Sequence, residues 1–212
     1  MTTHNLQATR RTLVRYQRIA PFYDHMEALA EPRYRAWRER LWSLVRGPKV
    51  LEVGVGTGKN MPFYPANFEI LAIDLTPGML ERARERARIL AIPNLELRQG
   101  DVQELEFPDA AFDAVVATFV FCSVPDPVLG LRELRRVARP DGQLVLLEHV
   151  RSPNPIVGTA MDAANPIIVR MMGANINRRT VDNVVAAGWQ LETVVDLGAG
   201  GIFKFIQGRN AC

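Results

Sequence analysis

Three glycines at alternate positions, directly after a short apolar segment, constrain the fold of this chain more than any other feature. They belong to the run E-x-G-x-G-x-G at residues 52–58, and the apolar residues 50–53 are predicted to form a β-strand. Glycine lets a backbone turn sharply and approach a ligand closely. Because open parallel sheets bind ligands at the carboxyl ends of their strands, the run predicts a ligand-binding turn at that edge.

Two common nucleotide-binding motifs do not fit this run. A phosphate-binding P-loop needs G-x-x-x-x-G-K followed by Ser or Thr, but Gly58 and Lys59 are followed by Asn60, and Val53 stands at the first glycine position. A dinucleotide fingerprint needs G-x-G-x-x-G, and here the third glycine comes one position early. A nucleotide-dependent dehydrogenase is therefore disfavoured.

The chain alternates between expected strands and helices. Thr76 as N-cap and Pro77 open one helix, and Asp126 and Pro127 open another. This alternation is typical of right-handed βαβ units and of a mostly parallel sheet. We expect a helical N-terminal cap at residues 1–46 and one globular unit at residues 47–212, with further strands at residues 68–73, 95–98, 112–119, 144–147, 189–196 and 202–207.

Composition indicates a globular protein. The chain has 212 residues, of which 48% are hydrophobic and 23% are charged. Its longest uncharged stretch, residues 114–125, is too short to cross a bilayer, and the polar N-terminus lacks the apolar core of a signal peptide. The two cysteines, Cys122 and Cys212, form neither a disulfide framework nor a metal-ligand pattern. We expect a cytoplasmic protein without a metal site.

Arginines cluster near the N-terminus, at Arg10, Arg11, Arg15 and Arg18. They have two interpretations: a solvated helix face, or a surface attracted to anionic lipid head groups. The second would place the protein peripherally at the inner membrane face. No nucleic-acid motif accompanies the arginines, so we expect no nucleic-acid partner.

The glycine run, together with two later acidic positions, resembles the first motifs of class I S-adenosylmethionine (SAM)-dependent methyltransferases. Asp74 ends the next expected strand, where a carboxylate can accept two hydrogen bonds from a ribose diol. Gly100 and Asp101 follow the third strand, at the family's adenine-binding position. The resemblance extends from about residue 49 to the end. It implies an α/β, Rossmann-like fold with a seven-stranded, mostly parallel sheet, helices on both faces, and SAM as cofactor.

The resemblance also implies which residues bind SAM. Tyr23 is expected to close over the methionine part of the cofactor, although packing within a helix is equally consistent with its position. The full set implied for the cofactor is Tyr23, Glu52, Gly54, Gly56, Gly58, Asp74, Leu75, Met79, Asp101, Val102 and Thr118.

Other segments narrow the resemblance to enzymes with amphiphilic or apolar acceptors. Residues 118–124 and 147–150 are similar to quinone-biosynthesis C-methyltransferases and to membrane-associated thiol methyltransferases. Residues 50–58 are shared with bacterial phospholipid N-methyltransferases, and residues 20–24 with the quinone group, where this segment folds over the cofactor. We expect methyl transfer to a phospholipid amine or a quinone precursor. A small thiol acceptor or a non-catalytic SAM-binding module remains as an alternative, and the oligomeric state stays open.

The acceptor side is predicted from three features. His149 ends a strand at the ligand edge and suits a general base, although it could equally be hydrogen-bonded or packed. Its neighbour Glu148 could orient nearby groups, and Cys122 is expected to be a buried small hydrophobe. The apolar, methionine-containing residues 152–172 are expected to form an acceptor lid, or else a core or subunit-contact segment.

Overall fold

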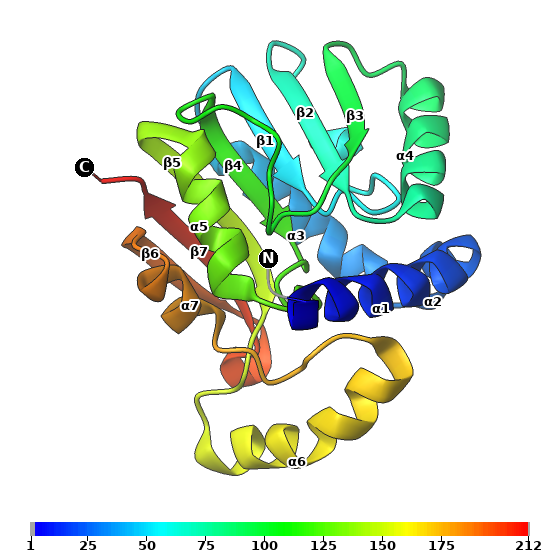
Figure 1. The fold of residues 1–212 in the computed structure, drawn as a ribbon, viewed down its shortest axis with the longest axis vertical. Coiled ribbons are helices and arrows are strands. Elements are labelled where there is room, and N and C mark those ends of the chain that lie inside the picture. Colours follow the sequence, from blue (N-terminus) through cyan, green and yellow to red (C-terminus); the bar gives the residue numbers. More distant parts are fainter. Residues whose placement is uncertain (1–2, 212) are drawn as a thin grey trace.

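One seven-stranded sheet organises the chain (Figure 1). The computed structural model describes residues 3–211, so residues 1–2 of the expected cap and Cys212 lie outside the described part. The strand order is β3-β2-β1-β4-β5-β7-β6; neighbouring pairs from β3 to β5 are parallel, and β7 is antiparallel to both β5 and β6. The predicted fold class, a Rossmann-like, mostly parallel α/β sheet, is confirmed.

The strands and helices alternate along the chain as the apolar pattern predicted. The strands are β1 (Lys49–Val53), β2 (Glu69–Asp74), β3 (Leu95–Gln99), β4 (Phe112–Thr118), β5 (Ala138–His149), β6 (Gln190–Leu197) and β7 (Phe203–Arg209). The helices are α1 (Thr3–Ile19), α2 (Tyr23–Glu27), α3 (Glu31–Leu44), α4 (Pro77–Leu90), α5 (Pro127–Val137), α6 (Pro155–Met172) and α7 (Thr180–Ala186).

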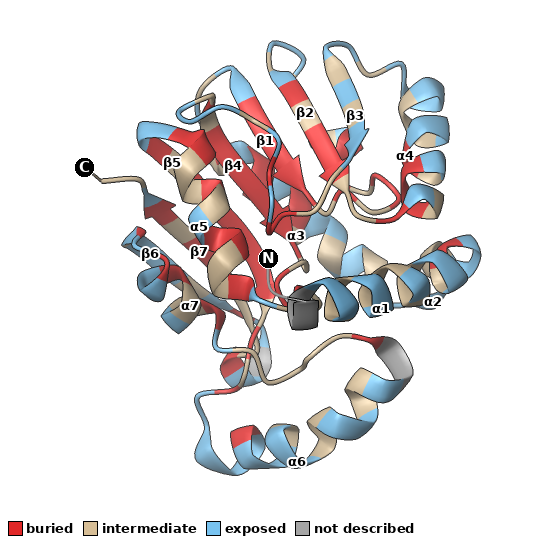
Figure 2. Cartoon of the chain, viewed as in Figure 1, coloured by how far each residue is buried: buried red, intermediate tan, exposed pale blue. Residues whose placement is uncertain are grey.

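Apolar clusters cover both faces of the sheet. On one face, α5 and α7 pack through residues such as Leu131 and Val184, and on the other, α3 and α4 pack through Trp42 and Leu80. The central strands are buried on both faces (Figure 2), which explains why β4 is apolar almost throughout. Packing on both faces holds the central strands in place, and with them the residues at the carboxyl ends of these strands.

Strand β5 is longer than the sequence predicted. The expected strand covered residues 144–147, but the observed strand is Ala138–His149 and includes residues 139–142. Asp141 keeps a turn-like positive φ of 61°, while its N–H donates to the carbonyl of Asn210, and Asn210 donates back to Gly142. These hydrogen bonds to Asn210 extend the pairing of β5 with the C-terminal segment through residues 141–142. The sequence around residues 139–142 does not reveal them, because the partner lies about 70 residues away.

Helix α6 lies apart from the two faces of the sheet (Figure 1). It is a capped α-helix: the side chain of Asn154 accepts hydrogen bonds from the N–H groups of Ile156 and Val157. Ile156 is 79% exposed and Ile167 is 64% exposed, so apolar side chains face outward. The side chains of Met171 and Met172, part of the predicted lid, lie outside the described residues. Within residues 3–211, no helix combines the length and apolar character that a membrane span requires.

Candidate active site: a cavity at the carboxyl edge of the sheet

A cavity lies where strands β1 to β4 end. Its walls come from the glycine run, from the residues that follow β2, β3 and β4, and from the N-terminal helices. Nine of the residues predicted to bind the cofactor line it: Tyr23, Gly54, Gly56, Asp74, Leu75, Met79, Asp101, Val102 and Thr118. The structure thus brings together residues that are far apart in sequence.

The glycine run adopts backbone conformations that other residues rarely adopt. Gly54 has φ = 65°, and a Cβ added there would lie 2.4 Å from a methyl carbon of Val120. Gly58 has φ = 83°, and its Cβ would lie 2.7 Å from the end of Met61. The run therefore turns tightly against the loop after β4 and leaves its backbone facing the cavity at Gly54 and Gly56.

Asp74 is fixed by the backbone and keeps the capacity to bind a diol. One carboxylate oxygen accepts from the N–H of Gly56 at 2.9 Å, and the other from the N–H of Thr76 at 2.8 Å. Each carboxylate oxygen has a further lone-pair site, so both can still accept from a ligand. Burial raises the pKa of Asp74, although these two backbone bonds lower it. Thr76 is the N-cap residue of α4, as predicted, although its side chain makes no capping hydrogen bond.

Glu52 and Gly58, which were also predicted to bind the cofactor, are not among the residues lining the cavity. Glu52 is 1% exposed and accepts hydrogen bonds from Asn60, at 2.6 Å, and from the Tyr64 hydroxyl. Burial raises its pKa to about 7. Asn60 also donates to the Thr118 hydroxyl at 3.0 Å, so Glu52 supports a residue of the cavity wall from behind.

The cavity continues to the ends of β2 and β3, where the resemblance placed the adenine. Asp101 accepts from the backbone N–H and the side-chain amide of Gln103. The Thr9 hydroxyl of α1 also points to this carboxylate, at 3.4 Å. Leu75 and Val102 contribute apolar surface between the polar groups. The arrangement offers apolar walls with a few oriented polar groups, as small-molecule sites do.

The N-terminal helices close the cavity, and most of their contribution was missed from the sequence. Thr12 and Tyr16 of α1 line the cavity together with the predicted Tyr23. Burial raises the pKa values of Tyr16 and Tyr23 well above their ordinary value, so both hydroxyls stay protonated at neutral pH. Tyr23 donates to a Glu27 carboxylate oxygen at 2.9 Å. Within the charged, polar helix α1, the aromatic ring of Tyr16 was the sequence feature that could have marked it as a cavity residue.

The loop after β4 forms the opposite wall and is held by Glu148. One oxygen of this carboxylate accepts from the N–H groups of Val120, at 2.9 Å, and Phe121, at 3.2 Å. Its other oxygen has no hydrogen-bond partner among the described residues, and the side chain is fully buried. Burial raises the pKa of Glu148 to about 7. Phe119, which starts the loop, has a strained φ of 57°.

His149 lies next to this wall, outside the residues that line the cavity. Its ring packs edge-on against Phe203, with the ring centroids 5.2 Å apart. The ring of Phe203 in turn packs against Phe119 of the wall, with the centroids 6.0 Å apart. Tyr34 and Trp37 of α3 complete an aromatic cluster, at 4.9 Å from Phe119 and 5.1 Å from Phe203 respectively. Burial lowers the pKa of His149, so its imidazole is neutral at pH 7.

Cys122 is buried, as expected of a small hydrophobe. Its thiol lies 3.4 Å from the carbonyl oxygen of Phe119. Burial raises its pKa to about 12. Because the thiolate is the nucleophilic form, this residue is suited to packing rather than to nucleophilic chemistry.

Comparisons with known proteins identify the family of this chain. Residues 51–146 match the family model described as a methyltransferase domain. A phosphatidylethanolamine N-methyltransferase of Cereibacter sphaeroides is 38% identical over 170 residues, covering 76% of this chain and 80% of the relative. A demethylmenaquinone methyltransferase of Renibacterium salmoninarum is 32% identical over 165 residues, covering 76% of this chain and 66% of the relative.

Solved structures share the same fold. The crystal structure of a SAM-dependent methyltransferase from Thermotoga maritima, described as a possible histamine N-methyltransferase, has a TM-score of 0.69 at 20% identity, covering 92% of this chain and 98% of that one. The fold is that of class I methyltransferases. The chain belongs to the methyltransferase-domain family and is a SAM-dependent methyltransferase.

Proposed function

We propose that this enzyme transfers a methyl group from SAM to an amine of an amphiphilic acceptor, with a phospholipid head group as the first candidate. The observation that supports a phospholipid acceptor is the similarity to a phosphatidylethanolamine N-methyltransferase, which extends over 76% of this chain. A quinone precursor is the second candidate, since a demethylmenaquinone methyltransferase also aligns over 76% of the chain.

The residues of the cavity fit SAM. The two oxygens of Asp74, each with a free lone-pair site, suit the two hydroxyls of a ribose. Asp101 and Val102 suit an adenine, and the exposed backbone of Gly54 and Gly56 suits close approach of the methionine part. Glu52 and Gly58 would act indirectly, by fixing the Asn60–Thr118 contact and the tight turn.

SAM supplies a methyl group made electrophilic by its sulfonium. The chain's contribution is to orient the acceptor, exclude water and take up a proton, because an amine must lose one on methylation. His149 is the proposed base: its pKa is lowered by burial, so the neutral imidazole can accept a proton at pH 7. Phe119 and Phe203 lie beside His149 and would form an apolar wall next to the acceptor.

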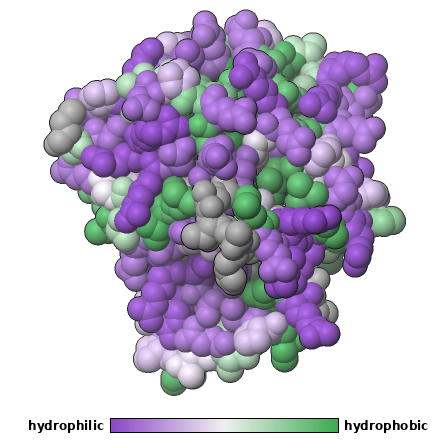
Figure 3. Space-filling model, viewed as in Figure 1, coloured by the Kyte–Doolittle hydropathy of each residue, from purple (hydrophilic) through white to green (hydrophobic). Residues whose placement is uncertain are grey.

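The acceptor is proposed to enter between α1 and α6. Arg10, Arg11 and Arg18 of α1 are exposed, and α6 exposes Ile156 and Ile167. In Figure 3, hydrophobic and near-neutral side chains gather at the lower end of the drawn face, over α6. A basic helix beside an exposed apolar helix suits an anionic lipid surface, which would place the enzyme peripherally at a membrane.

A labelled-methyl transfer assay tests the acceptor. Purified enzyme and labelled SAM are offered phosphatidylethanolamine vesicles, a demethylated quinone and a small thiol in parallel. We expect the highest rate with the phospholipid, and a rate at least roughly a hundredfold lower in a His149→Gln variant, the usual minimum contribution of a general base. A fast reaction with the thiol, together with no transfer to vesicles, would contradict the acceptor and leave the methyltransferase assignment intact.

A further inference from the structure

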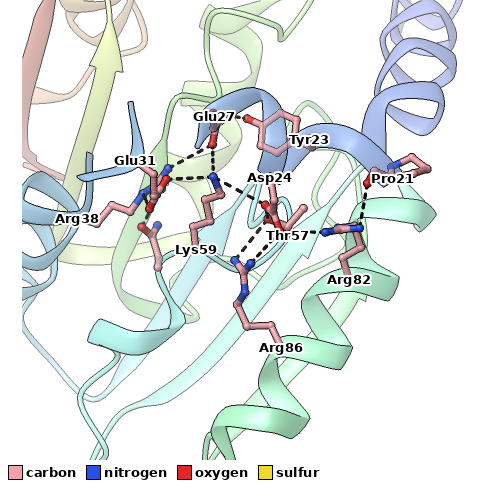
Figure 4. Close-up of polar contacts among 11 residues, drawn as sticks. Pro21, Tyr23, Asp24, Glu27, Glu31, Arg38, Thr57, Lys59, Arg82 and Arg86 are labelled. Atoms are coloured by element: carbon pink, nitrogen blue, oxygen red, sulfur yellow. Dashed lines mark hydrogen bonds and ion pairs between the residues drawn. The ribbon is translucent and has the colours of Figure 1, made fainter. Parts of the chain in front are cut away.

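Asp24 joins three separate parts of the chain through one carboxylate (Figure 4). It accepts a hydrogen bond of 2.6 Å from the Thr57 hydroxyl in the glycine run. On its other oxygen it accepts from the guanidinium groups of Arg82, at 3.0 Å, and Arg86, at 2.9 Å, both on α4. Arg82 also donates to the carbonyl of Pro21, just before α2. We call Asp24, Thr57, Arg82 and Arg86 the Asp24 latch.

A second link runs parallel to the first. Lys59, one residue past the glycine run, donates to Glu27 at 2.9 Å and to Glu31 at 3.0 Å. Glu27 is the residue that accepts from the Tyr23 hydroxyl. The ring that faces the cavity is therefore tied, through a carboxylate and a lysine, to the same glycine run that Asp24 holds.

Apolar packing does little to hold this part of the cap in place. By exposed area, no residue of α2 is fully buried, and the enclosed ring of Tyr23 faces the cavity rather than an apolar core. Phe22 is 64% exposed, Met26 is 55% exposed and Leu29 is 99% exposed. Since burial of apolar surface is what usually fixes a helix, the position of α2 depends mainly on its polar bonds to the glycine run and to α4.

The charged side chains of the Asp24 latch are partly buried and partly exposed to solvent. The Asp24 side chain is 21% exposed, and those of Arg82 and Arg86 are 35% and 29% exposed. Burial raises the pKa of Asp24, but the bonds from Thr57 and Arg82 outweigh it, so the pKa lies below its ordinary value. A charged acceptor bonded to two guanidinium groups makes stronger hydrogen bonds than a neutral pair.

We propose that Asp24 is a positioning residue that holds α2 closed over the cofactor and thereby sets how fast SAM enters and S-adenosylhomocysteine (SAH) leaves. Tyr23 faces the cavity, and its neighbour Asp24 accepts a hydrogen bond from Thr57 in the glycine run. Because the two residues are adjacent, a movement of α2 that opens the cavity would also break the Asp24 latch. A cap that lines the cavity with Thr12, Tyr16 and Tyr23 must move for ligand exchange. The inference rests on the proposed cofactor site and is independent of the acceptor.

The test is the release rate of SAH, measured by stopped-flow fluorescence with displacement by excess SAM. We expect the Asp24→Asn variant to release SAH about tenfold faster than the wild type, with weaker affinity in proportion by calorimetry. In the wild type, 0.5 M NaCl should also speed release because it screens partly exposed charges. The same salt should have little effect on the variant, whose latch is already broken.

Two further variants separate the latch from a general loss of structure. Glu85→Gln, on the same helix, removes a carboxylate that pairs with Arg88 at the surface, and it should release SAH at the wild-type rate. Arg86→Gln should accelerate release, and its combination with Asp24→Asn should be less than additive because both break the same contact. The melting temperatures of the ligand-free variants should stay close to that of the wild type.

The possible failures are distinguishable. A wild-type enzyme that binds no SAH overturns the cofactor assignment and this inference with it. Normal SAH binding by the wild type, with unchanged release in both Asp24→Asn and Arg86→Gln, overturns the latch alone. Faster release accompanied by a matching fall in the melting temperature of the ligand-free protein would also overturn it, because Asp24 would then be structural.

Discussion

At the scale of residues, the carboxyl groups of this enzyme divide into those that face a ligand and those that hold the walls. Asp74 and Asp101 line the cavity, whereas Glu52 and Glu148 are buried behind it. The buried pair have pKa values raised to about 7 by burial. The carboxylates of Asp74 and Asp101 are thus available to a ligand, whereas those of Glu52 and Glu148 accept hydrogen bonds from the residues that form the cavity walls or lie behind them.

Replacing Asp74 by Ala should weaken SAH binding by more than about 1.5 kcal/mol, the lower limit for a single hydrogen bond to a charged group. The loss includes two ligand bonds and the anchoring of Gly56 by its N–H bond to Asp74. Calorimetric titration measures the change, and circular dichroism checks that the fold survives. Unchanged affinity in a folded variant would show that the ribose is held elsewhere.

Replacing Glu148 by Gln should stabilise the protein at pH 8. The pKa of Glu148 is raised from 4.5 to about 7, so its favourable contribution is present below about pH 4.5 and is lost as the pH rises through about 7. The neutral amide avoids the cost of a buried charge, on the order of 3 kcal/mol for such a shift. Urea unfolding at pH 8 should show this gain. Below about pH 4.5, where Glu148 is protonated in both the folded and the unfolded protein, the two proteins should converge, and a constant difference between pH 4.5 and pH 8 would contradict the assignment.

At the scale of elements, the sequence predicted most of what local patterns encode. The glycine run, the end of β2 at Asp74 and the helix starts at Pro77 and Pro127 follow from periodicity and turn chemistry, and the structure has them where expected. Asp101 likewise follows the end of β3, as predicted. Tyr16 and the Asp24 latch could not be predicted in this way. Their partners lie on other elements, so their roles arise only when the cap folds onto α4 and the glycine run.

Helix α1 is the element on which the proposed membrane contact depends. Replacing Arg10, Arg11, Arg15 and Arg18 by Gln should lower methyl transfer to phosphatidylethanolamine in anionic vesicles, because each arginine near such a surface contributes about 1 kcal/mol. SAH affinity should be unchanged. The matched control replaces four exposed arginines on other elements: Arg84, Arg88, Arg98 and Arg132. Equal rates for both variants on vesicles of every lipid composition would contradict the role of α1.

At the scale of the whole molecule, the reversed strand β7 gives the carboxyl edge two distinct halves. The ends of β1 to β4 form the cofactor cavity, and beyond them Phe119, His149 and Phe203 meet where β4 and β5 end and β7 begins. The N-terminal cap closes the first half, and α6 stands beside the second (Figure 1). Division of the chain into a cap at residues 1–46 and a catalytic unit at residues 47–212 remains a prediction.

The central claim is that this cavity binds SAM and not another nucleotide, and the melting temperature of the wild-type protein tests it most directly. SAH should raise the melting temperature with increasing concentration, because a ligand at a hundred times its Kd stabilises the native state by about 2.7 kcal/mol. NAD and ATP at the same concentrations should leave it unchanged. Stabilisation by NAD or ATP without stabilisation by SAH would contradict the account.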